Sequence, residues 1–232
     1  MNFSEVNQMK KHTKTVALLV AALLVLGLSA CGGEKDGDTT TVPSDAGTSV
    51  PSATDSSTEP STTANEASNK KGTLENGVYT NGWANIAFRM PEGWIDTTAA
   101  LQAFSSAAAE FVFGCQDPEP ADGFYANLNI NISDISSSPQ LKTSEEYAVA
   151  AKQSLSLVNQ AQGIDCAVDD DLVKLNLCGE DYVAVRCECA KDGVSYIQYS
   201  LCRVTGSDAV VITVSVPSEE AAADLLTFFI GE

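Results

Sequence analysis

Four stretches with strand character follow one another directly between Leu172 and Val216, and no helical pattern separates them. Short turns that contain glycine join them: Gly179-Glu180-Asp181, Lys191-Asp192-Gly193 and Thr205-Gly206-Ser207. Two neighbouring parallel strands need a crossover connection of a dozen residues or more, which these turns are too short to supply. The pattern therefore predicts an antiparallel meander, and it limits the chain to folds built on an antiparallel sheet.

The turn Lys191-Asp192-Gly193 determines which side chains of its two strands share a face. We expect a three-residue hairpin with Gly193 in the left-handed conformation. In that register two sets of side chains share one face of the sheet: Val183, Val185 and Cys187 from the first strand, and Ile197, Tyr199 and Leu201 from the second. Cys202 then points to the opposite face.

Four more strands are predicted upstream, at Val78–Thr80, Ile86–Met90, Phe111–Phe113 and Phe124–Ile135. The last of these alternates Leu128, Ile130 and Ile132, which is typical of a strand with one buried face. Trp94 follows the turn Pro91-Glu92-Gly93, and we expect it to close one end of the core. Trp83 lies in a turn, where its indole suits either the core or a binding face.

Three helices complete the pattern. The first is expected from Asp96 or Thr97 to about Ala109, with Leu101, Phe104 and Ala108 on one face. The second begins with the capping box formed by Thr143 and Glu146 and ends at Gly163. Its apolar stripe is Tyr147, Ala151, Leu155 and Val158. Ser218 caps the third helix, which carries Leu225, Phe228 and Phe229. The fold class is therefore α+β, with an antiparallel sheet sandwiched by helices.

The N-terminal segment has the pattern of a secretory signal. Lys10, Lys11 and Lys14 precede an apolar run from Val16 to Leu28, which is shorter than the roughly 20 residues that a membrane-spanning helix needs. The run ends in Leu28-Ser29-Ala30-Cys31, which resembles the lipobox of bacterial lipoproteins. That resemblance implies cleavage before Cys31 and a diacylglyceryl group on its sulfur, and two acyl chains suffice for a stable anchor. The chain starts at Met1 or at Met9.

These features divide the chain into a signal peptide over residues 1–30, a lipidated tether over 31–72 and one α+β domain over 73–232. The tether is rich in Ser, Thr, Gly, Asp and Pro, and its only large aliphatic residues are Val42 and Val50. Such a segment buries too little apolar surface to offset the entropy of ordering it, so we expect it to be disordered. The expected location is the extracytoplasmic face of the cell membrane.

Composition excludes several kinds of chemistry and partner. The net charge of −18 disfavours nucleic acid, because phosphate binding needs clustered lysine and arginine. The only histidine, His12, lies in the signal peptide, so the mature chain lacks the residue needed for a Ser-His-Asp system or a histidine zinc site. Two acidic stretches have the carboxylates that a Ca²⁺ site needs, although neither matches the EF-hand loop pattern. They are Asp169–Asp171 and the set Asp117, Glu119 and Asp122. We favour solvated acidic loops, and we predict no metal and no cofactor.

The sequence does not decide whether the cysteines of the domain form disulfides. Six cysteines remain when Cys31 is assigned to lipid: Cys115, Cys166, Cys178, Cys187, Cys189 and Cys202. An even number in an exported protein suggests disulfides, yet several of these residues lie in apolar strand patterns, where free cysteine packs as a small hydrophobic residue. The pair Cys187 and Cys189 is too weak a redox or metal motif by itself, and we favour core packing for it.

Several sequence segments resemble the corresponding segments of secreted domains of the Mog1/PsbP-like group, including those of uncharacterised clostridial lipoproteins. These segments are Gly77-Val78-Tyr79-Thr80-Asn81, Ile86-Ala87-Phe88, Pro91-Glu92-Gly93-Trp94, Gly179-Glu180-Asp181-Tyr182, Gly193-Val194, Tyr196–Arg203 and Val210–Val214. The resemblance implies an antiparallel sheet sandwiched by helices, and it supplies no active site. Photosynthetic members of the group are accessory proteins of a larger complex.

The sequence thus predicts a non-catalytic binding or accessory lipoprotein that is attached to the membrane through its lipid and binds or assists an envelope protein or cell-wall partner. The alternative is a carboxylate- or cysteine-dependent enzyme or redox protein of the cell surface.

The lipid anchor has a direct test. Cys31→Ala is expected to abolish labelling of the protein by a radioactive or clickable fatty acid, because the acceptor sulfur is gone. It is also expected to block cleavage before residue 31, which mass spectrometry of the N-terminus would detect. Undiminished lipid labelling of the variant would contradict the assignment.

Overall fold

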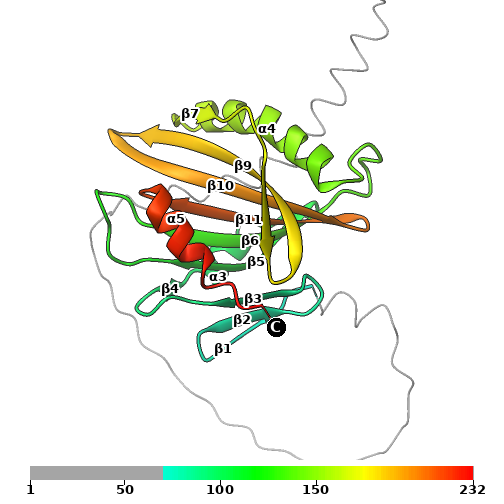
Figure 1. Ribbon diagram of the computed structural model, residues 1–232, viewed down its shortest axis with the longest axis horizontal. Coiled ribbons are helices and arrows are strands. Elements are labelled where there is room, and N and C mark those ends of the chain that lie inside the picture. The colour runs from blue at the N-terminus through cyan, green and yellow to red at the C-terminus, as the bar shows by residue number, and fades with distance from the viewer. Residues whose placement is uncertain (1–69, 232) are drawn as a thin grey trace, which may run out of the picture.

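The computed structural model describes residues 70–231, which form two antiparallel sheets and three helices (Figure 1). The small sheet has the strand order β1-β2-β3, and the large sheet has the order β4-β5-β6-β11-β10-β9-β7 with β8 paired to β9. Every strand pairing in the described residues is antiparallel, which confirms the sequence prediction.

The elements have the following bounds. The strands are β1 (Thr73–Glu75), β2 (Val78–Asn81), β3 (Ile86–Arg89), β4 (Ile95–Asp96), β5 (Ala109–Gln116), β6 (Asn127–Asp134), β7 (Asp165–Val168), β8 (Val173–Leu177), β9 (Glu180–Lys191), β10 (Val194–Thr205) and β11 (Asp208–Val216). The helices are α3 (Thr98–Gln102), α4 (Ser144–Ala161) and α5 (Glu219–Leu226). The short strands β1, β4 and β7 were not predicted from the sequence.

The long hairpin of β9 and β10 corrects the expected register. Lys191 pairs with Val194, so the loop has two residues, and Asp192 and Gly193 both have positive φ values of 53° and 84°. This is the pattern of a type I′ turn, which matches the twist of the flanking strands. The slip of one residue exchanges the faces of β10. Tyr196, Gln198, Ser200 and Cys202 therefore share the face of Val183, Val185 and Cys187, whereas Ile197, Tyr199 and Leu201 lie on the other face.

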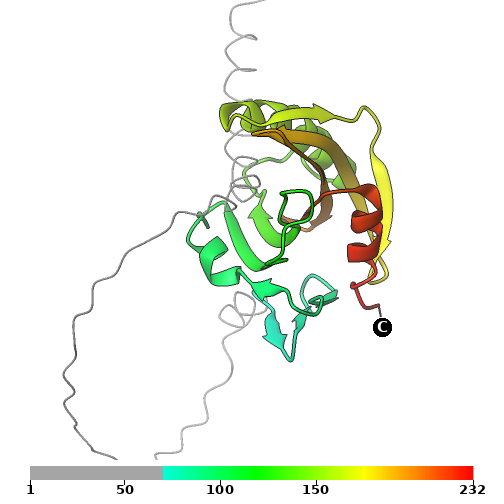
Figure 2. The same cartoon turned by 90° about the vertical axis from the view of Figure 1, so that its left-hand side faces the viewer.

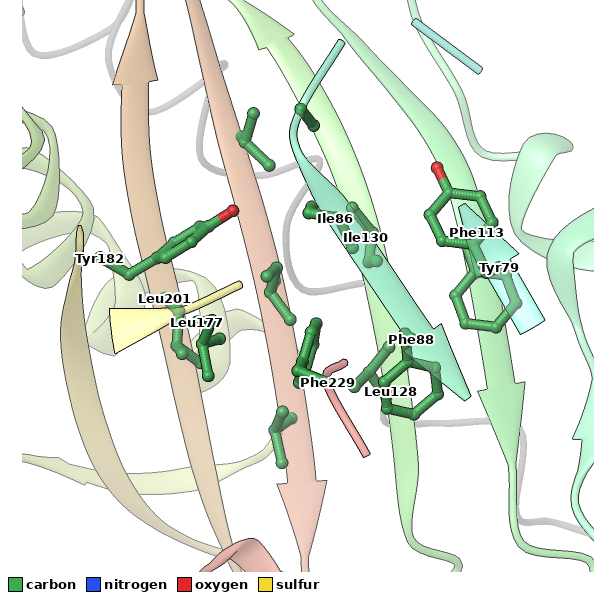
Figure 3. Close-up of a cluster of buried hydrophobic side chains, with 14 of the residues drawn as sticks. Tyr79, Ile86, Phe88, Phe113, Leu128, Ile130, Leu177, Tyr182, Leu201 and Phe229 are labelled. Atoms are coloured by element: carbon green, nitrogen blue, oxygen red, sulfur yellow. The ribbon is translucent and has the colours of Figure 1, made fainter. Parts of the chain in front are cut away.

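Aromatic side chains join the small sheet to the large one (Figure 3). The ring of Phe113 on β5 stacks on Tyr79 with 4.5 Å between centroids, and it meets Phe88 at 5.9 Å. Phe88 in turn contacts Phe229 beyond α5, at 5.0 Å. Leu128, Ile130, Ile132 and Leu201 of the large sheet pack around these rings. This core therefore lies between two sheets, so a sheet as well as α5 covers this face, where the sequence predicted helices.

The C-terminal segment extends the small sheet. Arg89 N donates to Phe228 O at 2.9 Å, and Ile230 N donates to Ala87 O at 2.8 Å. The predicted Ser218 cap is confirmed, because its hydroxyl accepts from Ala221 N, but α5 ends at Leu226. The two phenylalanines expected on the helix therefore follow it and connect it to β3.

The opposite face of the large sheet carries α4, on the far side from the small sheet in both views (Figures 1 and 2). The predicted capping box is confirmed, with Thr143 accepting from Glu146 N and Glu146 accepting from Thr143 N. Tyr147, Ala151 and Leu155 are buried as predicted. They pack on the β9 and β10 side chains that the two-residue turn places on this face.

The first helix is shorter than predicted. Residues 96–109 were expected to be helical, but α3 ends at Gln102. Beyond the helix, serine hydroxyls accept hydrogen bonds from backbone N–H groups. Ser106 Oγ accepts from Ala108 N and Ala109 N, and Ser105 Oγ accepts from Phe111 N. Such side-chain bonds compete with helical ones. Phe104 was expected on the buried face of this helix and is instead 49% exposed.

Both tryptophans pack on the core between the sheets and are half-buried. Trp94 thus packs on the core, as the sequence predicted. The ammonium group of Lys70 lies 5.1 Å from the centre of a Trp83 ring, so this indole combines core packing with a cation contact.

Candidate binding pocket and thiol cluster

The residues predicted for lipid attachment, Leu28, Ser29, Ala30 and Cys31, lie outside the described residues. Within residues 70–231, no helix is long and apolar enough to cross a membrane. The same residues contain no group of three or more His, Cys, Asp or Glu side chains arranged to hold a metal ion.

The acidic stretches considered for Ca²⁺ are engaged elsewhere. Asp169 accepts two hydrogen bonds from Arg186 at 3.1 Å, and Asp170 pairs with the ammonium of Lys152. Asp117 Oδ1 accepts from Glu119 N at 2.9 Å and closes a turn. These carboxylates therefore act in ion pairs and a loop.

A pocket of about 100 Å³ lies under α3 at the β4 edge of the large sheet. We call it the α3 pocket. Its lining residues are Thr97, Ala100, Leu101, Phe104, Cys115, Gln116, Asn127, Leu128 and Asn129. None of these side chains carries a charge at neutral pH.

A glycine allows α3 to approach the sheet closely. A Cβ on Gly114 would lie 2.0 Å from Leu101 Cδ1, so only glycine fits while Leu101 keeps its place. Two hydrogen bonds hold the contact: Thr97 N donates to Gly114 O at 2.8 Å, and Gly114 N donates to Thr98 Oγ1 at 3.1 Å. The Asp96 carboxylate accepts from Thr98 N at 2.8 Å and fixes the start of the helix. The backbone of β5 at Gly114 thus fixes the position of α3, which forms one wall of the pocket.

Asn129 supplies an unpaired hydrogen-bond acceptor at this pocket. Its side chain is only 4% exposed, and its Oδ1 has no hydrogen-bond partner. Leaving a buried acceptor unpaired costs about 1–3 kcal/mol. Phe104, by contrast, stands half in solvent beside the same hollow, and Ile95 on β4 is equally exposed. The pocket therefore combines an exposed apolar rim with a buried polar group.

Polar side chains continue from Asn129 across the centre of the sheet, on the face that carries α4. We call this set the polar strip: Asn129, Asn131, Gln198, Ser200, Thr213 and Ser215. Its members pair across strands, with Asn129 opposite Thr213 and Gln198 opposite Ser215. Gln198 Nε2 donates to Ser215 Oγ at 3.2 Å, but Asn131 Nδ2, Gln198 Oε1 and Thr213 Oγ1 have no partner. Buried polar groups normally find partners, so this concentration is unusual.

The sequence interpretation missed the polar strip. It identified Leu128, Ile130 and Ile132 correctly as one buried face, and it left the intervening residues to the outer face of the strand. The repeated asparagines at 127, 129 and 131 were the available signal, because asparagine is depleted in strands.

Three cysteines meet at the opposite edge of the sheet, and we call them the thiol cluster: Cys166, Cys187 and Cys189. Cys166 on β7 pairs directly with Cys189 on β9, and Cys189 Sγ donates to Cys166 Sγ at 3.6 Å. Cys187 and Cys189 are buried beneath α4, which agrees with the predicted core packing. The approach of Cys166 was not predicted. All six cysteines of the described residues are free thiols.

Comparison with known proteins gives fold-level similarity only. No family model and no curated protein matches the sequence. Among solved structures, the chain is similar to PsbP (CyanoP) of the cyanobacterium Synechocystis, with 17% identity, a TM-score of 0.47, and coverage of 69% of this chain and 95% of that one. It is also similar to the Ran-binding protein Mog1p of Saccharomyces cerevisiae, with 12% identity, a TM-score of 0.36, and coverage of 67% and 84%. A Pseudomonas aeruginosa protein of unknown function matches with 13% identity, a TM-score of 0.31, and coverage of 67% and 95%.

These neighbours include both folds named in the sequence resemblance. At such low identities and TM-scores they carry no inference about ligand or activity, so the candidate sites depend on this chain's own residues.

The unpaired acceptor of Asn129 generates a stability prediction. Replacing it with the similarly sized leucine removes a buried group that has no partner, so Asn129→Leu should leave the free energy of unfolding unchanged or raise it by about 1 kcal/mol. Asn81→Leu is the matched control, because Asn81 is equally buried but bonds Lys70 O, Tyr79 OH and Ala84 N. The control should lose about 2 kcal/mol or more in urea denaturation. Equal losses for the two variants would contradict the structure around Asn129.

Proposed function

We propose that this protein is a lipid-anchored protein of the extracytoplasmic membrane face, and that its domain binds another envelope protein without catalysing a reaction. The N-terminal pattern that ends at Cys31 supports the anchor. The expected tether over residues 31–72 would place the domain some distance from the lipid head groups.

The α3 pocket is the observation that carries the binding role. Its volume of about 100 Å³ corresponds to roughly three water molecules at about 30 Å³ each. Pockets that enclose whole small molecules have volumes of about 300–1,000 Å³. The α3 pocket therefore suits one side chain of a larger partner better than a complete substrate.

The lining determines what kind of side chain fits. An uncharged wall offers no compensation for a buried ion, so a charged group is disfavoured. The free Oδ1 of Asn129 is available to accept a hydrogen bond from a partner, and the exposed ring of Phe104 offers apolar contact at the rim. We infer a neutral donor such as an amide or hydroxyl side chain, presented by an apolar segment of the partner.

A non-catalytic role is also consistent with the composition of the domain. Residues 70–231 contain no histidine, and the pocket holds no carboxylate that can serve as a general acid or base. The pocket thiol, Cys115, is fully buried, and desolvation raises the pKa of this thiol far above its usual value. A thiol in that state is a poor nucleophile.

Photo-crosslinking in intact cells tests this proposal. A benzophenone amino acid replaces Phe104 at the pocket rim, and a matched control places it at Leu157, which is exposed on α4. We expect one defined protein adduct from position 104 and none of that mass from position 157. Adding Asn129→Leu should greatly reduce the adduct, because the hydrogen-bond acceptor is lost. Equal adducts from both positions, or an adduct insensitive to Asn129→Leu, would contradict the assignment.

A further inference from the structure

The thiol cluster lies at the β7 edge of the large sheet, and the α3 pocket lies at the β4 edge. We propose that the cluster is a reversible dithiol–disulfide site, in which Cys166 reacts with a small-molecule disulfide and Cys189 displaces the product. This inference is independent of the proposed binding function, because it rests on different residues at the other end of the sheet.

The strand register places Cys166 and Cys189 at a distance that a disulfide can bridge. Asp169 N donates to the backbone oxygen of Arg186, and continuing the register by one residue places these two opposite each other, so they correspond to a hydrogen-bonded position of the ladder. Hydrogen-bonded and non-hydrogen-bonded pairs alternate along an antiparallel ladder, so Cys166 and Cys189 form a non-hydrogen-bonded pair. The Cα atoms of such pairs are about 4.5 Å apart, within the range of about 4.4–6.8 Å found for disulfides.

The third thiol is less suited to bond formation. Cys187 lies opposite Val168, so it is diagonal to Cys166. Diagonal positions have Cα atoms about 7–8 Å apart, and Cα separations above about 7 Å require backbone movement before a disulfide forms. Cys187 therefore remains a thiol next to the reacting pair.

The reacting sulfur has a route to solvent. Cys166 is half-buried on the outermost strand of the sheet, whereas Cys187 and Cys189 are buried. Cys166 lines a hollow of about 440 Å³ at the end of α4, together with Ser156, Gln160, Gly163, Ile164 and Asp165. Cys189 is among the residues that line a second hollow of about 330 Å³, which shares Asp165 with the first. Hollows of this size admit a small organic disulfide.

Neighbouring groups favour the thiolate form of Cys166. Hydrogen bonds from the thiols of Cys187 and Cys189 lower the pKa of Cys166, and the Asn159 amide adds a weaker contribution. Asn159 is buried, and its Nδ2 has no partner within hydrogen-bond geometry. The same contacts raise the pKa values of Cys187 and Cys189, since these two keep the protons. Cys166 is therefore the attacking thiol, and the buried Cys189 is the resolving thiol.

The exchange balances without a metal or cofactor. The Cys166 thiolate attacks one sulfur of a disulfide RSSR, so the reagent S–S bond breaks, RS⁻ leaves and a Cys166–S–S–R bond forms. Cys189 then loses its proton and attacks the Cys166 sulfur, which forms the Cys166–Cys189 bond and releases the second RS⁻. The two protein thiols together lose two electrons and two protons, and RSSR gains them to become two RSH.

Glutathione buffers provide the test. The reduced full chain is equilibrated with defined ratios of oxidised and reduced glutathione, quenched in acid, alkylated and mapped by mass spectrometry without reduction. We expect a linked Cys166–Cys189 product, and we expect Cys166 to react about tenfold faster than Cys178 at neutral pH because its thiolate is stabilised. Cys178 is a suitable internal reference, since it is also half-buried and its thiol donates only to backbone oxygens.

Two variants assign the roles. Cys189→Ser should abolish the internal link and leave glutathione attached to Cys166, whereas Cys187→Ser should keep the link. Far-UV circular dichroism and thermal melting would show that both variants fold, and the wild-type map tests the pairing without any substitution. Absence of the linked product in the wild type at every ratio that modifies Cys178 would overturn the proposal. Retention of the internal link in Cys189→Ser would do so as well.

Discussion

The packing of Phe113 against Tyr79 and Phe88 is the contact on which the rest of the domain depends (Figure 3). A three-stranded sheet with strands of three or four residues buries too little surface to be stable alone. The large sheet, in turn, would expose Leu128, Ile130 and Leu201 to water if the small sheet were absent. Each sheet therefore supplies the cover that the other needs, and Phe229 ties the end of the chain into the same contact.

This arrangement leaves the two faces of the large sheet chemically different. The face toward the small sheet is closed by aromatic and aliphatic packing. The face toward α4 changes along the sheet, from thiols and aliphatic residues beneath the helix to the polar strip and the α3 pocket. The two candidate sites thus occupy opposite ends of one sheet, and each one adjoins a short edge strand. Edge positions suit both roles, because they combine a fixed backbone with access from solvent.

The sequence predicted the fold class and the best-defined helix because those features have local causes. Thr143 and Glu146 form a capping box from four consecutive residues, and alternation at Leu128, Ile130 and Ile132 is sufficient to assign a strand face. The register of β9 and β10 was wrong because a two-residue and a three-residue loop at Asp192-Gly193 differ by one position, which exchanges the faces of β10. The site residues depended on that register and on the pairing of β7 with β9. No local sequence pattern could therefore predict that Cys166 lies next to Cys189. The assignment of Cys31 as the lipid attachment site remains a prediction.

The most direct test of this account is whether the two faces of the large sheet lose their packing in the same unfolding transition. The fluorescence of Trp83 and Trp94, the only tryptophans, reports the core between the sheets, and pulsed alkylation of the buried Cys202 reports the face beneath α4. If each sheet needs the other as cover, the fluorescence change and the exposure of Cys202 should follow one transition with the same urea midpoint. Loss of the tryptophan signal at a urea concentration where Cys202 stays protected would contradict the account, because it would show that the large sheet is stable without the small one.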